Sequence, residues 1–344
     1  MPAPAAETAD ETAAQGRSLH GHRPAACIAS RGMAQDKPLL GILLMLGFCI
    51  VAPLGDATAK LLGDSLPLLQ LIVVRFLLQA AMLFPVTLIG GRAWRMHGRV
   101  LWLTVARTVL HILGITMMFS ALRYLELADA VAIAFVMPFI MLLLGRFVLG
   151  EEVGYRRLAA CAIGFVGTLM VIQPSFAEVG LPALLPLGVA LSFSLFMMVT
   201  RQIAKEVDPI GMQAVSGLMA TAVLVPLAAI LWLLDAPGSS FVRPQGADWM
   251  LLLLIGVIGS FGHLLMTWSL RYAPAATLAP MQYLEIPFAT LIGWLIFHDL
   301  PDGLAGLGIL VTVGAGLYVV LRERALARAA PGTVEPLPPV PPAA

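Results

Sequence analysis

Ten long apolar segments occupy most of this sequence, and each is long enough to cross a lipid bilayer. A transmembrane helix needs about 20 mostly apolar residues. The segments are residues 39–62, 67–90, 100–122, 128–149, 158–174, 182–200, 210–234, 249–270, 275–297 and 304–321. Most connections between them are short, which leaves no room for a soluble domain. The sequence therefore predicts an all-α membrane protein with ten transmembrane helices.

The composition supports a membrane protein and argues against several classes of ligand. Hydrophobic residues make up 59% of the chain and charged residues only 12%, whereas soluble domains carry about 25% charged residues. The net charge of +1 gives no basis for nucleic-acid binding. The three cysteines, Cys27, Cys49 and Cys161, match no metal or redox spacing. We therefore expect no nucleic-acid partner, no metal and no cofactor.

The basic residues predict the orientation of the spans. If the N-terminus lies inside and the spans alternate, inside segments carry fifteen Lys and Arg residues. Outside loops then carry only two, Arg123 and Arg243. Inside loops of membrane proteins are enriched in Lys and Arg, so this bias predicts an even number of spans with both termini in the cytoplasm.

The two ends of the chain differ from the rest. Residues 1–37 are rich in Ala, Pro and polar residues and contain no apolar core typical of a secretory signal. We expect a disordered cytoplasmic tail there, and Met33 is a second candidate for the translation start. Residues 322–344 are rich in Arg and Pro, which predicts a second cytoplasmic tail that is disordered toward its end.

Two segments share four features in the same order, which indicates an internal repeat. Leu-Arg-Tyr occurs at 122–124 and again at 270–272. Each is followed by a Pro-Phe inside an apolar run, at Pro138 and Pro287, then by an acidic turn and a Gly-rich last span. If each half has five spans, an odd number, the second half lies in the membrane with the opposite orientation to the first. Inverted repeats are recurrent in secondary transporters, with the substrate site between the halves near the membrane midplane.

These motifs resemble the EamA-type drug/metabolite transporter superfamily over residues 38–324. The Gly-Glu-Glu turn at 150–152 matches the family's acidic turn, whereas the second copy has His298-Asp299 there. The resemblance implies two five-helix repeats, at 38–174 and 182–321, in a bacterial cytoplasmic membrane. It also implies secondary transport of a small organic metabolite, similar to riboflavin, S-adenosylmethionine or amino-acid carriers, by a monomer or homodimer.

Three ionisable residues lie near the outer half of the first two spans. A charge inside the membrane costs about 2.5–3.5 kcal/mol on insertion scales, so each needs compensation or a function. Asp56 and Lys60 are one helical turn apart, which predicts that Lys60 neutralises Asp56. Arg75 reaches a similar depth. The three form either a structural ion cluster, acting as an outer gate, or a site for substrate or protons.

A second polar group lies in the third and eighth spans. Arg107 and His111 form another pair four residues apart, with His111 near the midplane. Arg107 is either a clamp for a substrate anion or a structural residue that binds carbonyl groups or Glu285 across the bundle. His263 is either a packed core residue or part of the site.

Glu285 is the strongest single candidate for binding substrate or protons. It lies about 15 Å deep in the ninth span, between Pro280 and Pro287 and beside Gln282 and Tyr283. Each proline frees a backbone carbonyl, and such breaks are tolerated where protein or a cavity satisfies the freed groups. A carboxylate buried there could bind and release protons near neutral pH.

Two other classes of function remain as alternatives. A membrane-embedded enzyme would need paired aspartates for a metal, a nucleophile with its base, or a nucleotide loop, and the sequence contains no such motif. A passive channel without proton coupling would not need the inverted repeat. Proton-driven accumulation of a solute, without its chemical conversion, distinguishes a transporter from both.

Overall fold

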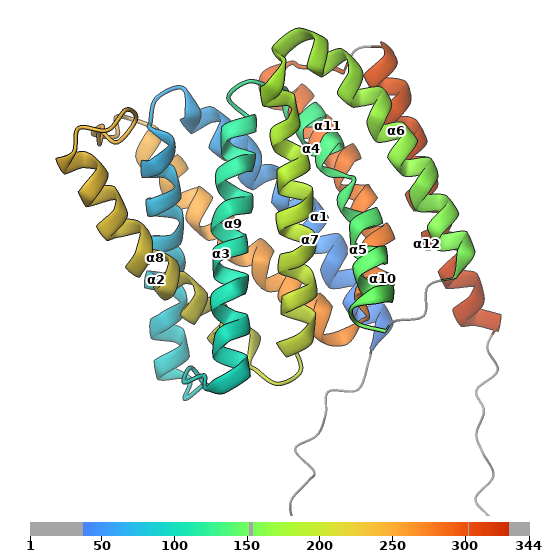
Figure 1. Ribbon diagram of the computed structural model, residues 1–344, viewed down its shortest axis with the longest axis horizontal. Coiled ribbons are helices and arrows are strands. Elements are labelled where there is room, and N and C mark those ends of the chain that lie inside the picture. Colours follow the sequence, from blue (N-terminus) through green and yellow to red (C-terminus); the bar gives the residue numbers. More distant parts are fainter. Residues whose placement is uncertain (1–36, 151–153, 302, 330–344) are drawn as a thin grey trace, which may run out of the picture. The chain divides into compact units, whose positions relative to one another are not determined.

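The computed structural model describes residues 37–150, 154–301 and 303–329, which belong to one compact unit and form no strand (Figure 1). The predicted disorder at residues 1–36 and at the Pro-rich end lies outside the described residues, as does the alternative start at Met33. The long helices are α1 (Pro38–Gly63), α2 (Leu68–Ile89), α3 (Gly98–Ala121), α6 (Tyr155–Val179), α7 (Leu185–Ile203), α8 (Pro209–Leu233), α9 (Asp248–Tyr272) and α12 (Gly303–Ala329).

The prediction of a ten-helix membrane protein is confirmed. Within the described residues, eight helical segments are long and apolar enough to cross a membrane, and two shorter apolar helices cover Met281–Phe297 and Gly303–Tyr318. Helix α12 continues to Ala329, so residues 322–329 of the predicted C-terminal tail are helical.

Two of the spans are interrupted at corresponding places in the two halves. The fourth span consists of α4 (Leu127–Ala134) and α5 (Met137–Phe147), and the ninth consists of α10 (Ala275–Leu278), the 3₁₀ helix η2 (Ala279–Leu284) and α11 (Glu285–Phe297). Pro138 lies in the first turn of α5 and Pro280 in the first turn of η2. A proline ring clashes with the carbonyl one turn earlier and lacks an N–H, so a new helix begins at these positions instead of a straight span continuing.

The helix contacts repeat when the two halves are exchanged. Helix α1 packs on α9 and α3 packs on α7, which are equivalent pairs if α1 corresponds to α7 and α3 to α9. Helix α2 packs on α8, and α6 packs on α12 (Figure 1). Two related five-helix halves would produce this symmetric set of helix contacts. The predicted repeat boundaries, 38–174 and 182–321, remain a prediction.

The loops gather at two ends of the helical bundle. One end, here called the predicted cytoplasmic end, joins Arg92 to Asp208 across a 2.9 Å ion pair. The other, the predicted external end, joins Ser65 to Asp248 by a hydrogen bond of 3.2 Å. Each contact connects loops that the alternation of ten spans places on the same side. The structure thereby places the basic loops together, as the charge bias requires.

Cysteine labelling tests this arrangement. In a cysteine-free background, Ser240→Cys and Gly303→Cys should react with an impermeant maleimide in intact cells, because both positions are exposed at the predicted external end. Lys205→Cys, exposed at the opposite end, should react only after permeabilisation. Labelling of all three positions in intact cells would contradict the ten-span arrangement.

Candidate functional site

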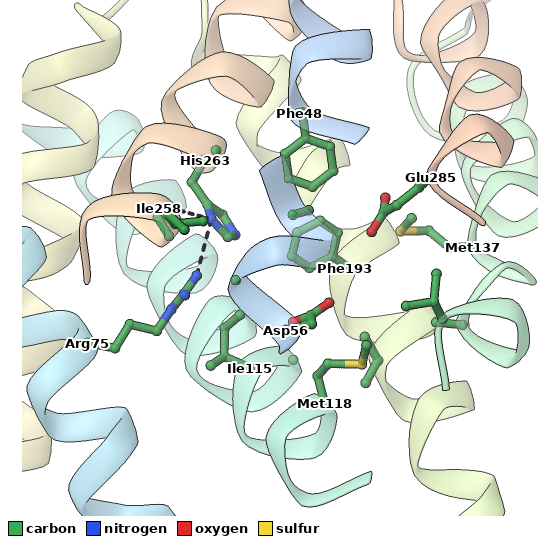
Figure 2. Close-up of a pocket in the computed structure, with 18 of the residues that line it drawn as sticks. Phe48, Asp56, Arg75, Ile115, Met118, Met137, Phe193, Ile258, His263 and Glu285 are labelled. Carbon is green, nitrogen blue, oxygen red and sulfur yellow. Dashed lines mark hydrogen bonds between the residues drawn. The ribbon is translucent and has the colours of Figure 1, made fainter. Parts of the chain in front are cut away.

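A cavity lies between the two halves of the bundle (Figure 2). Helices α1 to α5 line it from the first half, and α7, α9 and α11 line it from the second. Its walls are mostly apolar, but four ionisable side chains reach it: Asp56, Arg75, His263 and Glu285. Four of the nine candidates from the sequence therefore meet in one place, although they come from four different helices.

Two carboxylates face this cavity. Figure 2 shows the Asp56 and Glu285 side chains directed into the same space from α1 and α11. Glu285 is only 7% exposed, and no described residue donates a hydrogen bond to either carboxylate. Glu285 is also the first residue of α11, where the helix dipole favours a negative charge. The two acidic groups are close enough to interact electrostatically, so a proton on either one relieves their repulsion.

Arg75 provides the positive charge of the cavity, and its hydrogen bonds are weak. Its Nη1 donates to the Ile255 carbonyl at 3.5 Å, and its Nη2 lies 3.4 Å from His263 Nδ1. Its Nε has no partner among the described residues. The guanidinium lies directly against Gly259, where a Cβ atom would collide with it. Arg75 therefore keeps donor capacity for a group inside the cavity, and it interacts electrostatically with Asp56.

His263 lies beside Arg75 and closes one side of the cavity. Its Nδ1 lies 2.9 Å from the Gly259 carbonyl, a much better hydrogen-bond distance than the 3.4 Å to Arg75. We therefore assign the proton to Nδ1, which donates to Gly259. The ring also packs against Phe48 and Phe193 with centroids 6.1 and 5.7 Å away.

The predicted pairing of Lys60 with Asp56 is wrong. Lys60 Nζ instead forms an ion pair with Asp299 at 3.2 Å, donates to the Leu125 carbonyl at 3.2 Å, and lies 4.9 Å from the centre of the Phe297 ring. Lys60 is near the external end of α1, so its long side chain reaches the α11–α12 loop. It thereby joins α1 of the first half to the second half, outside the cavity.

Arg107 is enclosed by neutral acceptors rather than by a carboxylate. It is 0% exposed, and its guanidinium lies 4.5 Å from the centre of the Phe196 ring. Its hydrogen bonds go to Thr200 at 2.8 Å, Ser216 at 2.7 Å, Gln213 at 2.7 Å and Thr267 at 3.3 Å. Its guanidinium therefore does not pair with Glu285, and Arg107 does not line the cavity. This network joins α3 to α7, α8 and α9.

The other three candidates also lie away from the cavity. His111 is 0% exposed and packs against the rings of His263, Phe196 and Phe76, with centroids 4.2, 4.9 and 5.0 Å away. Gln282 is buried, and its amide contacts the Met197 sulfur at 3.0 Å. Tyr283 packs against Gly164 of α6 and Gly316 of α12.

Sequence reasoning missed the apolar walls of the cavity. Aromatic rings and thioethers form much of the lining, including Phe48, Phe193, Met118 and Met137 (Figure 2). In a membrane protein such residues are common in every span, so their type carries little signal. A stronger signal was available in α9, where glycines recur every third residue at 256, 259 and 262. The last two line the cavity.

Comparisons with known proteins agree with this architecture. Residues 39–173 and 180–322 each match the EamA-like transporter family. A riboflavin transporter of Rhizobium johnstonii is 31% identical, covering 68% of this chain and 74% of that protein. An S-adenosylmethionine uptake transporter of Rickettsia prowazekii is 23% identical, covering 83% and 94%. A pseudopaline exporter of Pseudomonas aeruginosa is 26% identical, covering 86% and 96%. One crystal structure shares the fold, with a TM-score of 0.59 at 19% identity over 84% of this chain and 98% of that chain.

A double-mutant comparison tests the partner of Lys60. Lys60→Gln should lower the stability of the purified protein by about 0.5–1 kcal/mol, because the ion pair is partly exposed to solvent. Adding Asp299→Asn should then cost little more, since the ion pair is already broken. Adding Asp56→Asn should have an independent effect. Thermal melting of the single and double variants measures both couplings, and coupling of Lys60 to Asp56 rather than to Asp299 would contradict the assignment.

Gly259 offers a test of the cavity itself. Gly259→Ala should displace the Arg75 guanidinium and reduce transport strongly while the protein still inserts, because the new Cβ would occupy the place of Nη1. Gly262→Ala is the matched control: it also lines the cavity, but its Cβ would lie 3.4 Å from Val51, an ordinary contact. Transport assays on equal amounts of inserted protein compare the two. Equal effects of the two substitutions would show that Arg75 does not depend on Gly259.

Proposed function

The chain belongs to the EamA-like transporter family, and from this premise we propose that it is a proton-coupled secondary transporter of a small polar metabolite. It acts by alternating access in the bacterial cytoplasmic membrane, with both termini in the cytoplasm. The observation that carries the proposal is the placement of Asp56 and Glu285 in one cavity between the two halves. Substrate sites of inverted-repeat transporters lie at such interfaces.

Two carboxylates that accept no hydrogen bond from a described residue support the proposal of proton coupling. Charged groups buried without partners are costly, and no described residue donates a hydrogen bond to Asp56 or Glu285. With one proton bound, Arg75 balances the remaining negative charge and the cavity is neutral. Without that proton the cavity carries one excess negative charge. Binding and release of a proton at Glu285 therefore changes the charge that a substrate meets.

The lining indicates the kind of substrate. Phe48 and Phe193 offer ring faces 6.3 Å apart between centroids, and Arg75 offers hydrogen-bond donors to an anionic group. The two carboxylates accept from an amine or hydroxyl. A metabolite with an apolar or ring portion and both donor and acceptor groups fits this set, which suits amino-acid or cofactor-like compounds. The relatives named for riboflavin and S-adenosylmethionine are consistent with that class.

The contacts at the external end supply a closure for such a site. Lys60 joins α1 to Asp299 in the second half and to the carbonyl of Leu125 in the loop after α3. Lys60 and Leu125 both belong to the first half, so only the ion pair with Asp299 must break if the two halves separate at that end. The two side chains of this ion pair are partly exposed, with exposures of 20% for Lys60 and 29% for Asp299. The modest strength of such an ion pair suits a contact that forms and breaks during each transport cycle.

The alternatives predict different behaviour. An enzyme would change the metabolite chemically, and a passive channel would equilibrate it without accumulation. A proton-coupled transporter accumulates it unchanged until a protonophore removes the gradient. The oligomeric state, monomer or homodimer, does not enter this distinction.

Reconstituted vesicles test the role of Glu285. The assay uses whichever of labelled riboflavin, S-adenosylmethionine or amino acids the wild-type protein accumulates. Glu285→Gln should abolish accumulation driven by a proton gradient and leave part of the substrate exchange, because the amide cannot ionise but retains hydrogen bonding. Glu206→Gln is the control, since this exposed carboxylate pairs with Arg99 outside the cavity. Full proton-driven accumulation by Glu285→Gln would rule out the proposed role.

A further inference from the structure

Helices α6 and α12 run side by side (Figure 1), and a groove separate from the cavity lies between them. The two helices lie very close together where Gly167 faces Gly308 and Thr312, since a Cβ at Gly167 would collide with both. Nearer the predicted cytoplasmic end they are less tightly packed, and a Cβ at Gly314 would meet no atom within 4 Å. The groove begins there, on the outer surface of the bundle.

The groove has an apolar floor that faces away from the protein core. Ala159 and Ile163 line it from α6, and Leu310 and Gly314 line it from α12. Ile163 is 54% exposed and Leu310 is 69% exposed. In a membrane these surfaces contact lipid tails rather than water. Arg156 lies seven residues before Ile163 on α6, so the apolar floor extends about 10 Å from it.

A basic and aromatic cluster lies at the cytoplasmic end of the groove. Arg156 and Tyr318 line the groove, and Arg156 Nε donates a hydrogen bond of 2.9 Å to the Tyr155 hydroxyl. That hydrogen bond is the main reason why the pKa of Tyr155 is lowered, and the charge of Arg322 adds to it. Arg322 lies one helical turn after Tyr318 on α12, so each of the two helices carries one arginine near this end of the groove.

We propose that this groove is a binding site for an anionic phospholipid. One acyl chain lies along Ala159, Ile163, Leu310 and Gly314, and the phosphate accepts hydrogen bonds from Arg156 and Arg322. Basic pockets between transmembrane helices on the cytoplasmic side suit anionic headgroups, and arginine binds phosphate by paired hydrogen bonds. The proposal does not depend on the transport function.

The charge of the site favours an anionic headgroup over a zwitterionic one. Phosphatidylcholine carries a choline cation that two arginines would repel, whereas phosphatidylglycerol carries a net negative charge. Glu151 and Glu152 precede Arg156 in the sequence but lie outside the described residues. A direct comparison of the two headgroups with identical acyl chains therefore decides whether the positive charge dominates.

Native mass spectrometry of the detergent-purified protein measures this preference. Wild-type protein should bind dioleoyl phosphatidylglycerol more tightly than dioleoyl phosphatidylcholine. Each of Arg156→Gln and Arg322→Gln should weaken phosphatidylglycerol binding about fivefold, given about 1 kcal/mol per arginine near a headgroup. Gly314→Leu should remove the preference by filling the groove, and it should fold normally because that space is open.

Matched controls make the test specific. Arg95→Gln removes an exposed arginine elsewhere, and Ala229→Leu places a leucine at an exposed position on α8. Both should retain wild-type lipid binding. Equal binding of the two lipids by wild-type protein would overturn the proposal. Unchanged phosphatidylglycerol binding in Gly314→Leu, or in both arginine variants, would overturn it as well.

Discussion

The cost of placing charge inside a lipid bilayer governs how this protein is built. The described structure meets that cost in three ways. Arg107 is surrounded by hydroxyl and amide acceptors from α7, α8 and α9. Lys60 reaches the end of its helix and pairs with Asp299. Asp56, Arg75 and Glu285 instead face a cavity, where they can be compensated by a proton or a substrate. The first two arrangements join the halves of the bundle, whereas the third leaves three charged groups facing the proposed transport site.

The interrupted helices explain why the cavity lies where it does. Glu285 begins α11 immediately after the 3₁₀ turn of η2, so a carboxylate and a helix N-terminus meet deep inside the bundle. In the first half, the break between α4 and α5 supplies Phe135 and Met137 to the cavity lining. A straight span would carry neither the break in the backbone nor the helix dipole at that depth. The prolines therefore shape the site through the backbone breaks, although their side chains do not line the cavity.

Much of the fold could be predicted from the sequence, because membrane thickness fixes helix length and because basic residues report the side of each loop. The candidate site was harder to predict. Helical spacing correctly places Asp56 and Lys60 on one face of α1, but the true partner of Lys60 is Asp299, 239 residues away. Arg107 was recognisable as a buried cation, whereas its neutral acceptors come from three other helices. Glu285 was identifiable because the prolines around it mark a break. Contacts between distant helices depend on how the bundle packs, and spacing along one helix contains no information about that.

Transport as proposed requires that Asp56 and Glu285 exchange a proton with the aqueous phase through one shared cavity. Infrared difference spectroscopy of the reconstituted protein, recorded across a pH change, detects the carbonyl stretch of a protonated carboxyl group directly and needs no substrate. We expect a protonated carboxyl band that disappears in Glu285→Gln and shifts in Asp56→Asn, because the two groups interact. A band that is unchanged in both variants would contradict the claim, since the proton would then bind elsewhere in the protein.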